Sequence, residues 1–198
     1  AKATGIFSFF KRVLVNDSTK LALPKKLAPH FPGSCNQTQK QNAMISLQTT
    51  LDLLSETYVY FGVTPFTYND QRAAPDILEI ISAGDLIIRD LGYFVPRVFR
   101  AIMDKCAYFL SRYHHGTDLV DAHGNKTDLL AVLEKTPLLD TRLYLGKQAR
   151  VPVRLVAIPV PDKVANERRR KLLKNKNRDR RLNPSKEQLA LCGWEIFV

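Results

Sequence analysis

Residues 84–94, GDLIIRDLGYF, are the stretch that decides the fold predicted for this chain. Residues 85–89 form a short, mostly apolar run, which is typical of a buried strand. Gly84 stands before the run as a helix stop, and Asp90 follows it at the start of a turn. An acid that directly follows a buried strand in this way is expected at the edge of a sheet.

Amphipathic helices are predicted on both sides of this strand. Before it, the Asn69-Asp70 pair can cap a helix in which the isoleucines of residues 77–81 have helical spacing. After it, residues 95–103 repeat apolar side chains with the period of a helix, and residues 106–110 read as another strand. Strands that alternate with helices imply right-handed parallel crossovers. The sequence therefore predicts an α/β fold, a mixed sheet flanked by helices.

The first part of the chain is predicted to be an antiparallel meander. Residues 12–16 are prone to form a strand, residues 17–19 (Asp-Ser-Thr) have the chemistry of a turn, and residues 20–23 form a second strand. Residues 29–42 are expected to be a loop. Apolar and polar residues then alternate over residues 43–53, which indicates a half-buried third strand.

The pattern changes after residue 112, where helix–strand alternation gives way to strands punctuated by proline. Strands are predicted over residues 142–146 and 151–158, with a short helix within residues 127–133. We therefore expect two domains, residues 1–112 with the mixed sheet and residues 113–198 as a separate β-rich region.

The positive charge of the chain is concentrated in one segment. The formal net charge is +11. Residues 150–186 hold 13 Lys and Arg against three Asp and Glu, whereas the rest of the chain is nearly neutral. Such a density of cations attracts a polyanion through the release of counterions. Nucleic acid is favoured over an anionic membrane, because no Trp or Phe accompanies the cations. A solvated helix or a tail without a ligand is the alternative.

Nine cations of this segment are predicted to contact DNA phosphates and not base edges. Backbone contacts tolerate loose placement, whereas base readout needs side chains held in register. The nine do not share one helical face, so we expect the segment to bend or to leave the helix near residues 175–177. The residues are Arg168, Arg169, Arg170, Lys171, Lys174, Lys176, Arg178, Arg180 and Arg181.

Asp17 and Asp90 are the two candidate metal ligands. Each directly follows a short apolar strand and begins a segment of small or polar residues. Neighbouring strands would bring both carboxylates to one edge of the sheet, where they can hold divalent cations at a phosphodiester. Each acid could instead only cap a turn or a helix, a position where Asp is common anyway.

Other chemistries find little support. The three cysteines are far apart, which argues against disulfides or a zinc site and fits a reducing cytosol. Cys106 lies in a predicted apolar strand and is expected in the core. The sequence contains none of the glycine-rich or serine-nucleophile motifs of phosphate-binding loops and hydrolases, and no apolar run is long enough for a membrane helix. The beginning and end of the chain indicate a piece of a longer protein.

Four stretches of this chain resemble bacterial insertion-sequence transposases of the DDE type. VLVNDST at residues 13–19 resembles the motif of the first catalytic Asp, and residues 84–94 resemble that of the second. AYFLSR at residues 107–112 resembles the following strand. VRLVA at residues 153–157, the basic segment and GWEIFV at residues 193–198 resemble the β-strand insertion and its return to the catalytic core.

The resemblance implies a fold, an activity and a set of partners. Residues 1–112 would be the first part of a ribonuclease-H-like catalytic core, and residues 113–198 a β-rich insertion whose basic segment holds DNA. The parent enzyme would cut the ends of a mobile element and join them to target DNA, with two Mg²⁺ or Mn²⁺ ions held by Asp17 and Asp90. A homodimer, located in the cytoplasm with the nucleoid, is expected.

The third acid of this family is a Glu in a Tyr-Arg-Glu-Lys type motif beyond the insertion, which this chain does not reach. Neither Glu187 nor Glu195 has that motif around it. We therefore expect the chain alone to be inactive.

Three other functions stay open. One is a DNA-binding remnant of a transposase without catalysis, and another is a nuclease of the same fold that acts on junctions or RNA hybrids. The third is an RNA-binding protein, which would need exposed aromatic residues on a sheet. Most Tyr and Phe residues here have core-like positions in the sequence.

Overall fold

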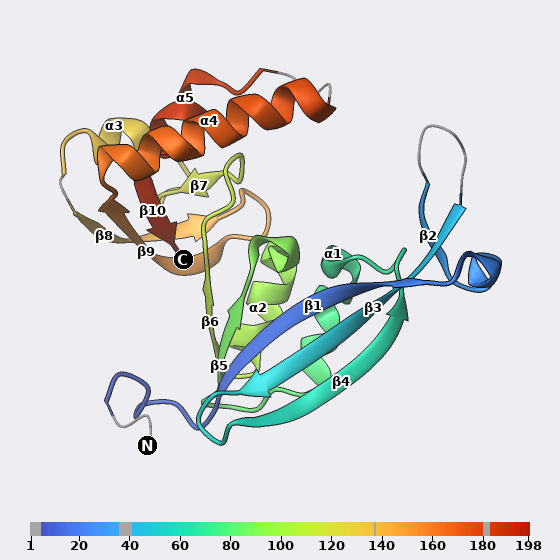
Figure 1. The fold of residues 1–198 in the computed structure, drawn as a ribbon. Coiled ribbons are helices and arrows are strands. Elements are labelled where there is room, and N and C mark those ends of the chain that lie inside the picture. Colours follow the sequence, from blue (N-terminus) through green and yellow to red (C-terminus); the bar gives the residue numbers. More distant parts are fainter. Residues whose placement is uncertain (1–4, 36–40, 137, 180–182) are drawn as a thin grey trace. The chain divides into compact units, whose positions relative to one another are not determined.

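A computed structural model describes residues 5–35, 41–136, 138–179 and 183–198 of the chain (Figure 1). The chain divides into two compact units, Ala1–Ser111 and Arg112–Val198, each with its own sheet. No helix in the described part combines the length and the apolar character needed to cross a membrane.

The first unit is built on a mixed sheet. Its strands are β1 (Val13–Leu23), β2 (Pro32–Cys35), β3 (Gln41–Asp52), β4 (Thr57–Pro65), β5 (Leu86–Arg89) and β6 (Tyr108–Ser111). β4, β3 and β1 are antiparallel neighbours, and β5 and β6 then continue the sheet parallel to β1. In this order β3 alone runs antiparallel to the other strands, which is the ribonuclease-H-like arrangement. The predicted α/β class is confirmed.

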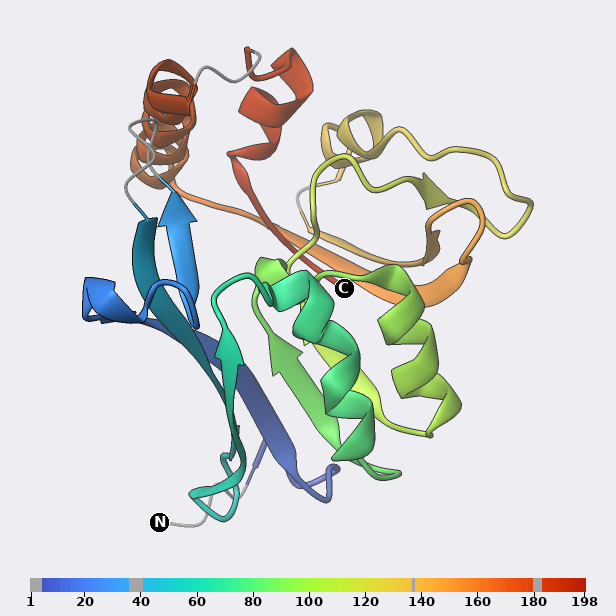
Figure 2. The same cartoon turned by 90° about the vertical axis from the view of Figure 1, so that its right-hand side faces the viewer.

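Helices and turns cover one face of this sheet (Figure 2). They are α1 (Asp70–Ala73), α2 (Pro96–Asp104) and two 3₁₀ turns, η2 (Ala74–Glu79) and η3 (Leu91–Tyr93). A further 3₁₀ turn, η1 (Lys25–Leu27), follows the end of β1 and buries none of its residues. As predicted, the Asn69 side chain caps α1 by accepting the backbone N–H of Arg72. Ile77 of η2 and Ile102 of α2 are fully buried against the sheet, as their spacing predicted.

Two expectations for the first strands are wrong. Residues 17–19 do not form a turn, because β1 continues through them and pairs with β3 from Leu14 to Leu23. The hydrogen-bond partners that β3 supplies along this whole length outweigh the local preference of Asp-Ser-Thr for a turn. Residues 29–42 are not only a loop, since they contain β2 and the start of β3. The sequence interpretation also missed β4, which pairs with the other edge of β3.

The opposite face of the sheet carries exposed aromatic residues. Residues that pair across antiparallel strands share a face, so Asp17, Thr49 and Phe61 lie side by side on it. Tyr58 and Phe61 on β4 and Tyr108 on β6 are all exposed. The expectation that the aromatic residues are mostly core-like is therefore wrong for these three.

The second unit is an antiparallel sheet with three helices, and its order is β10-β9-β8-β7. The predicted strands are β8 (Leu139–Leu145) and β9 (Val151–Pro159), and the predicted short helix is α3 (Leu129–Leu133). The remaining elements are β7 (Leu119–Val120), α4 (Asp162–Asp179), α5 (Lys186–Leu191) and β10 (Trp194–Phe197).

Two further expectations are corrected. α4 is continuous from Asp162 to Asp179, so the basic segment neither bends nor leaves the helix near residues 175–177. Cys106 is exposed and not in the core. It has a left-handed backbone, with φ of 56°, in the turn that joins α2 to β6.

Ile87 tests the core of the first unit because it is completely buried on the central parallel strand β5. We expect Ile87→Ala to lower the free energy of unfolding by about 2–5 kcal/mol, through the lost burial and the cavity left behind. Urea unfolding, followed through the amide signals of β5 and β6, measures this change. The exposed Val63→Thr on β4 is the control and should change stability by no more than about 0.5 kcal/mol. An equal effect of both variants would show that this core is misplaced.

Candidate active site

The two candidate acids follow the ends of one parallel ladder. β1 and β5 are neighbours, and their register runs from Val13 opposite Leu86 to Asn16 opposite Arg89. Asp17 and Asp90 are the next residue on each segment. Because side chains alternate between the two faces of a strand, both acids continue the exposed, aromatic-bearing face of the sheet. The strand adjacency that a shared metal site requires is therefore present.

The carboxylates of both acids are largely uncommitted. Asp17 is exposed, and among the described residues its carboxylate accepts only the backbone N–H of Ser18, at 2.7 Å from Oδ1. Asp90 is exposed at the N-cap of η3 but makes no side-chain capping bond there. The alternative role as a cap is thus not seen for Asp90.

A buried polar pair lies immediately before the acids, on the helix-covered face. The guanidinium of Arg89 donates from Nε and Nη2 to Oδ1 of Asn16, at 3.0 and 2.8 Å. Its Nη1 donates to the carbonyl oxygen of Ala74 in η2, at 2.8 Å, and its plane lies 4.6 Å from the ring centre of Tyr93. Burial lowers the pKa of Arg89 to about 10, so the group stays charged at neutral pH.

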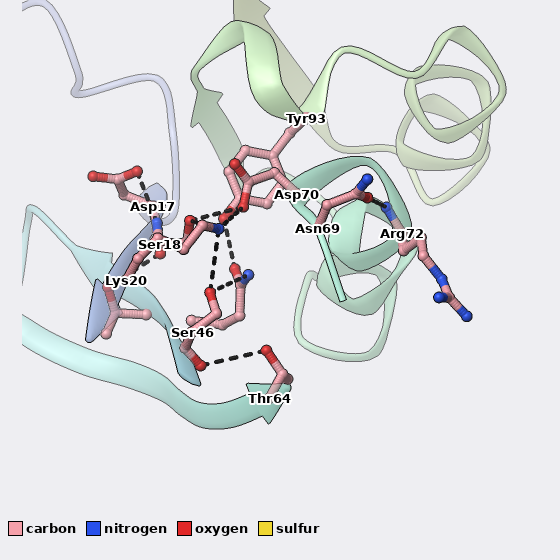
Figure 3. A network of polar contacts seen from close by, with 11 residues as sticks. Asp17, Ser18, Lys20, Ser46, Thr64, Asn69, Asp70, Arg72 and Tyr93 are labelled. Atoms are coloured by element: carbon pink, nitrogen blue, oxygen red, sulfur yellow. Dashed lines mark hydrogen bonds and ion pairs between the residues drawn. The ribbon is translucent and has the colours of Figure 1, made fainter. Parts of the chain in front are cut away.

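A second polar network lies on the helix-covered face, around the residues of β1 that follow Asp17 (Figure 3). The carboxylate of Asp70, at the start of α1, accepts from the Ser18 hydroxyl at 2.7 Å and from the Lys20 ammonium at 3.1 Å. Lys20 also donates to the hydroxyls of Ser18 and Ser46. The Asp17 carboxylate points away from this network (Figure 3). Asp70 therefore holds the part of β1 that follows Asp17.

The same carboxylate touches the turn that follows Asp90. A Cβ on Gly92 would stand 2.9 Å from Oδ2 of Asp70, closer than real Cβ contacts allow. Gly92 thus lets the turn approach the carboxylate. Tyr93, in the same turn, donates to Oε1 of Gln48 on β3 at 2.5 Å, and burial raises its pKa to about 12.

The donor set at the two acids fits a divalent cation that prefers oxygen. Both side chains are carboxylates, and each directly follows the last register pair of the parallel β1–β5 ladder, which suits Mg²⁺ or Mn²⁺. Across the residues that the structure describes, no group of three His, Cys, Asp or Glu is placed to hold a metal ion. Glu195 is engaged elsewhere, in ion pairs with Arg112 and Arg168 in the second unit.

The cations of α4 fall into two groups, those that contact the rest of the second unit and those that are exposed. Arg168 pairs with Glu195 and donates to the carbonyl oxygen of Trp194 on β10, and Arg169 donates to that of Leu189 on α5. These two half-buried arginines fix α4 to its own unit, which explains why the cations do not share one helical face. The exposed members of the predicted set are Arg170, Lys171 and Lys174. The side chains of Lys176 and Arg178, and residues Arg180 and Arg181 entirely, lie outside the described part.

Sequence reasoning missed the polar residues around the acids. Asn16 and Arg89 directly precede the two acids, and each interrupts a run of apolar strand residues. That interruption is the signal that could have found them. Asp70 gave only a capping signal, because its contacts with Ser18 and Gly92 arise from the tertiary fold.

Comparison with known proteins identifies the family of this chain. The family profile described as a transposase DDE domain matches residues 8–189 of the chain. The chain belongs to this transposase family. Its predicted membership of the DDE type is thereby confirmed, over the segment that contains both Asp17 and Asp90.

Several curated relatives are insertion-sequence transposases. The transposase of element IS231B from Bacillus thuringiensis subsp. berliner is 28% identical over 211 residues, which cover 96% of this chain and 43% of the relative. That of IS231D from subsp. finitimus is 28% identical over 220 residues, which cover 100% of this chain and 45% of the relative. The chain thus spans less than half the length of these transposases.

Among solved structures, a piggyBac transposase in a synaptic complex with hairpin DNA aligns with a TM-score of 0.42 and 12% identity. The match covers 76% of this chain and 31% of that chain, and it is too distant to assign a fold.

Asp70 makes a testable contribution to stability against acid. Burial alone would raise its pKa, but hydrogen bonds from Ser18 and Lys20 and the charge of Lys20 outweigh burial, so the pKa lies below its usual 3.8. A lowered carboxyl pKa stabilises the folded state above pH 3.8, and this stabilisation is lost as the pH falls through the folded-state pKa. We therefore expect Asp70→Asn to lower the melting temperature at pH 7, and the difference from the wild type to shrink below pH 3.8.

Melting temperatures measured by circular dichroism between pH 7 and pH 2 check this expectation. Asp104→Asn is the control, since the exposed Asp104 side chain makes no ion pair or hydrogen bond in the described structure. A difference for Asp70→Asn that stays constant with pH would contradict the assigned network.

Proposed function

We propose that this chain is the first part of the catalytic region of a DNA transposase. The observation that carries the proposal is the position of Asp17 and Asp90, one residue beyond the end of a parallel ladder and on the same exposed face. Membership of the DDE family supports it. In this proposal residues 1–112 belong to the ribonuclease-H-like core, and residues 113–198 form an insertion.

Asp17 and Asp90 would hold Mg²⁺ or Mn²⁺, two ions in the longer enzyme. Bound metal would supply charge stabilisation at the attacking and leaving oxygens of a phosphodiester. The chain's own contribution is to present two carboxylates from a rigid sheet, with few competing hydrogen bonds. A 3′-hydroxyl or water would then attack DNA at this edge, first at the ends of a mobile element and then at target DNA.

The exposed cations of α4 would hold the phosphate backbone of that DNA. Arg170, Lys171 and Lys174 lie within five residues of one another on a helix, and none of them has an intramolecular partner in the described structure. Their contacts would position DNA without reading its sequence. We infer that the longer protein works as a homodimer on the two element ends, in the cytoplasm with the nucleoid.

Metal binding by the two acids can be measured on the chain itself. We expect Mn²⁺ to broaden the amide signals around Asp17 and Asp90 in nuclear magnetic resonance spectra, with weak affinity because a third acid is missing. Asp17→Asn or Asp90→Asn should each abolish the broadening, since each removes half of the anionic donors. The control Asp104→Asn, at the C-terminal end of α2, should bind Mn²⁺ with no more than a small change. Broadening that survives in both acid variants would refute the metal site.

DNA binding by α4 can be measured through its salt dependence. Each phosphate contact contributes about 0.9 to the slope of log affinity against log salt concentration. Replacing Arg170, Lys171 and Lys174 by Ala should therefore lower that slope by about 2.7, equally for an element end and for random duplex. Fluorescence anisotropy across a salt series measures both quantities.

The matched control replaces three exposed cations elsewhere in the second unit, Lys135, Arg142 and Lys147, by Ala, and should leave most of the slope unchanged. Arg168→Ala should mainly lower the melting temperature, because it removes an anchor of α4. A triple variant that keeps the wild-type slope, or loses affinity for one sequence only, would contradict phosphate binding by α4.

A further inference from the structure

The parallel ladder between β1 and β5 ends one residue before the acids. Its last register pair is Asn16 and Arg89. Beyond it β1 continues beside β3, whereas the chain of β5 leaves the sheet into η3. In the described structure the backbone therefore does not pair Asp17 with Asp90, and another interaction has to keep the two acids at the same level of the sheet.

Arg89 makes the contacts that can do this. Its guanidinium donates two hydrogen bonds to the amide oxygen of Asn16, across the last register pair. It donates a third to Ala74 in η2 and packs over the ring of Tyr93, in the turn that Asp90 begins. One side chain thus joins β1, η2 and η3 directly beneath the acids.

Arg89 occupies a buried strand position where packing alone would favour an apolar side chain. The side chain is buried, with only 6% of the residue exposed, yet no carboxylate lies within ion-pair distance of it among the described residues. Burying a cation among neutral acceptors is costly. An apolar residue here would fill a buried strand position at no such cost, as Ile87 does, but it would not tie the turn to β1.

We propose that Arg89, through its two hydrogen bonds to Oδ1 of Asn16, is a positioning residue that sets the relative placement of Asp17 and Asp90. The inference rests on the metal site proposed above. The planar guanidinium fixes distance and direction at once, which a lysine ammonium cannot do. Residues that orient metal ligands in this way change metal affinity by roughly 10- to 100-fold when they are replaced.

The opposite end of the same ladder offers a matched control. Arg12 directly precedes the first register pair and forks onto Asp85, with N–O distances of 3.0 and 2.5 Å. It also donates to the carbonyl oxygen of Ile80, the residue after η2. Arg12 therefore ties β1 to the start of β5 as Arg89 ties it to the end, but far along the strands from the acids.

The experiment compares Arg89→Lys with Arg12→Lys in the 198-residue chain. Both variants should lower the melting temperature. Only Arg89→Lys should weaken Mn²⁺ binding, roughly 10- to 100-fold, as titrated by broadening of the amide signals. The Tyr93 amide donates to the carbonyl oxygen of Asp90 at 3.0 Å. In metal-free samples, only Arg89→Lys should speed hydrogen exchange of this amide.

If Arg89→Lys does not fold, a second pair of variants tests the positioning role of Arg89. Asn16→Asp keeps an acceptor for the guanidinium and should retain Mn²⁺ binding. Asn16→Leu removes the acceptor and should weaken Mn²⁺ binding roughly 10- to 100-fold, as expected for Arg89→Lys. Equal Mn²⁺ affinity of Arg89→Lys and Arg12→Lys, or of the two Asn16 variants, would overturn the positioning role. If the wild type binds no Mn²⁺, or binds it independently of Asp17, the proposed metal site itself fails.

Discussion

The parallel pairing of β1 with β5 is the constraint on which the candidate site depends. Four register pairs hold the two strands together, and the acids follow the last of them on both segments. Parallel strands run in the same direction, so the residues that follow the last register pair, Asp17 within β1 and Asp90 after β5, lie at the same level of the sheet. Two carboxylates separated by 72 residues of sequence are thereby placed together without any direct bond between them.

The two faces of this sheet have opposite chemistry near the acids. The helix-covered face buries polar groups, with Asn16, Gln48 and Thr50 all nearly inaccessible to water. These groups find partners in one another, in Arg89 and in Tyr93, as buried polar groups require. The other face leaves Asp17 and Asp90 exposed. A connected polar network has few alternative arrangements, so it provides rigid support for the strand segments that carry the two exposed acids.

The cations of the basic helix fall into two groups, those that fix the helix to its own unit and those that are exposed and proposed to bind DNA. Arg168 and Arg169 reach inward to carbonyl groups and to Glu195, which gives α4 a fixed place on its own unit. Arg170, Lys171 and Lys174 remain on the exposed surface of the same helix. Charge counting from sequence cannot separate the two groups, because both consist of the same residue types side by side.

The sequence by itself determined the fold class, the helices around GDLIIRDLGYF and the two acids as candidates, because apolar periodicity and capping residues are local signals. Only the tertiary structure decided that Asp-Ser-Thr continues β1, since pairing with β3 supplies what a turn would otherwise provide. Only the tertiary structure revealed Arg89, Asn16 and Asp70 as neighbours of the acids. The contacts of Arg89 with Asn16 and of Asp70 with Ser18 join residues more than fifty positions apart, and such contacts leave no periodic trace in the sequence.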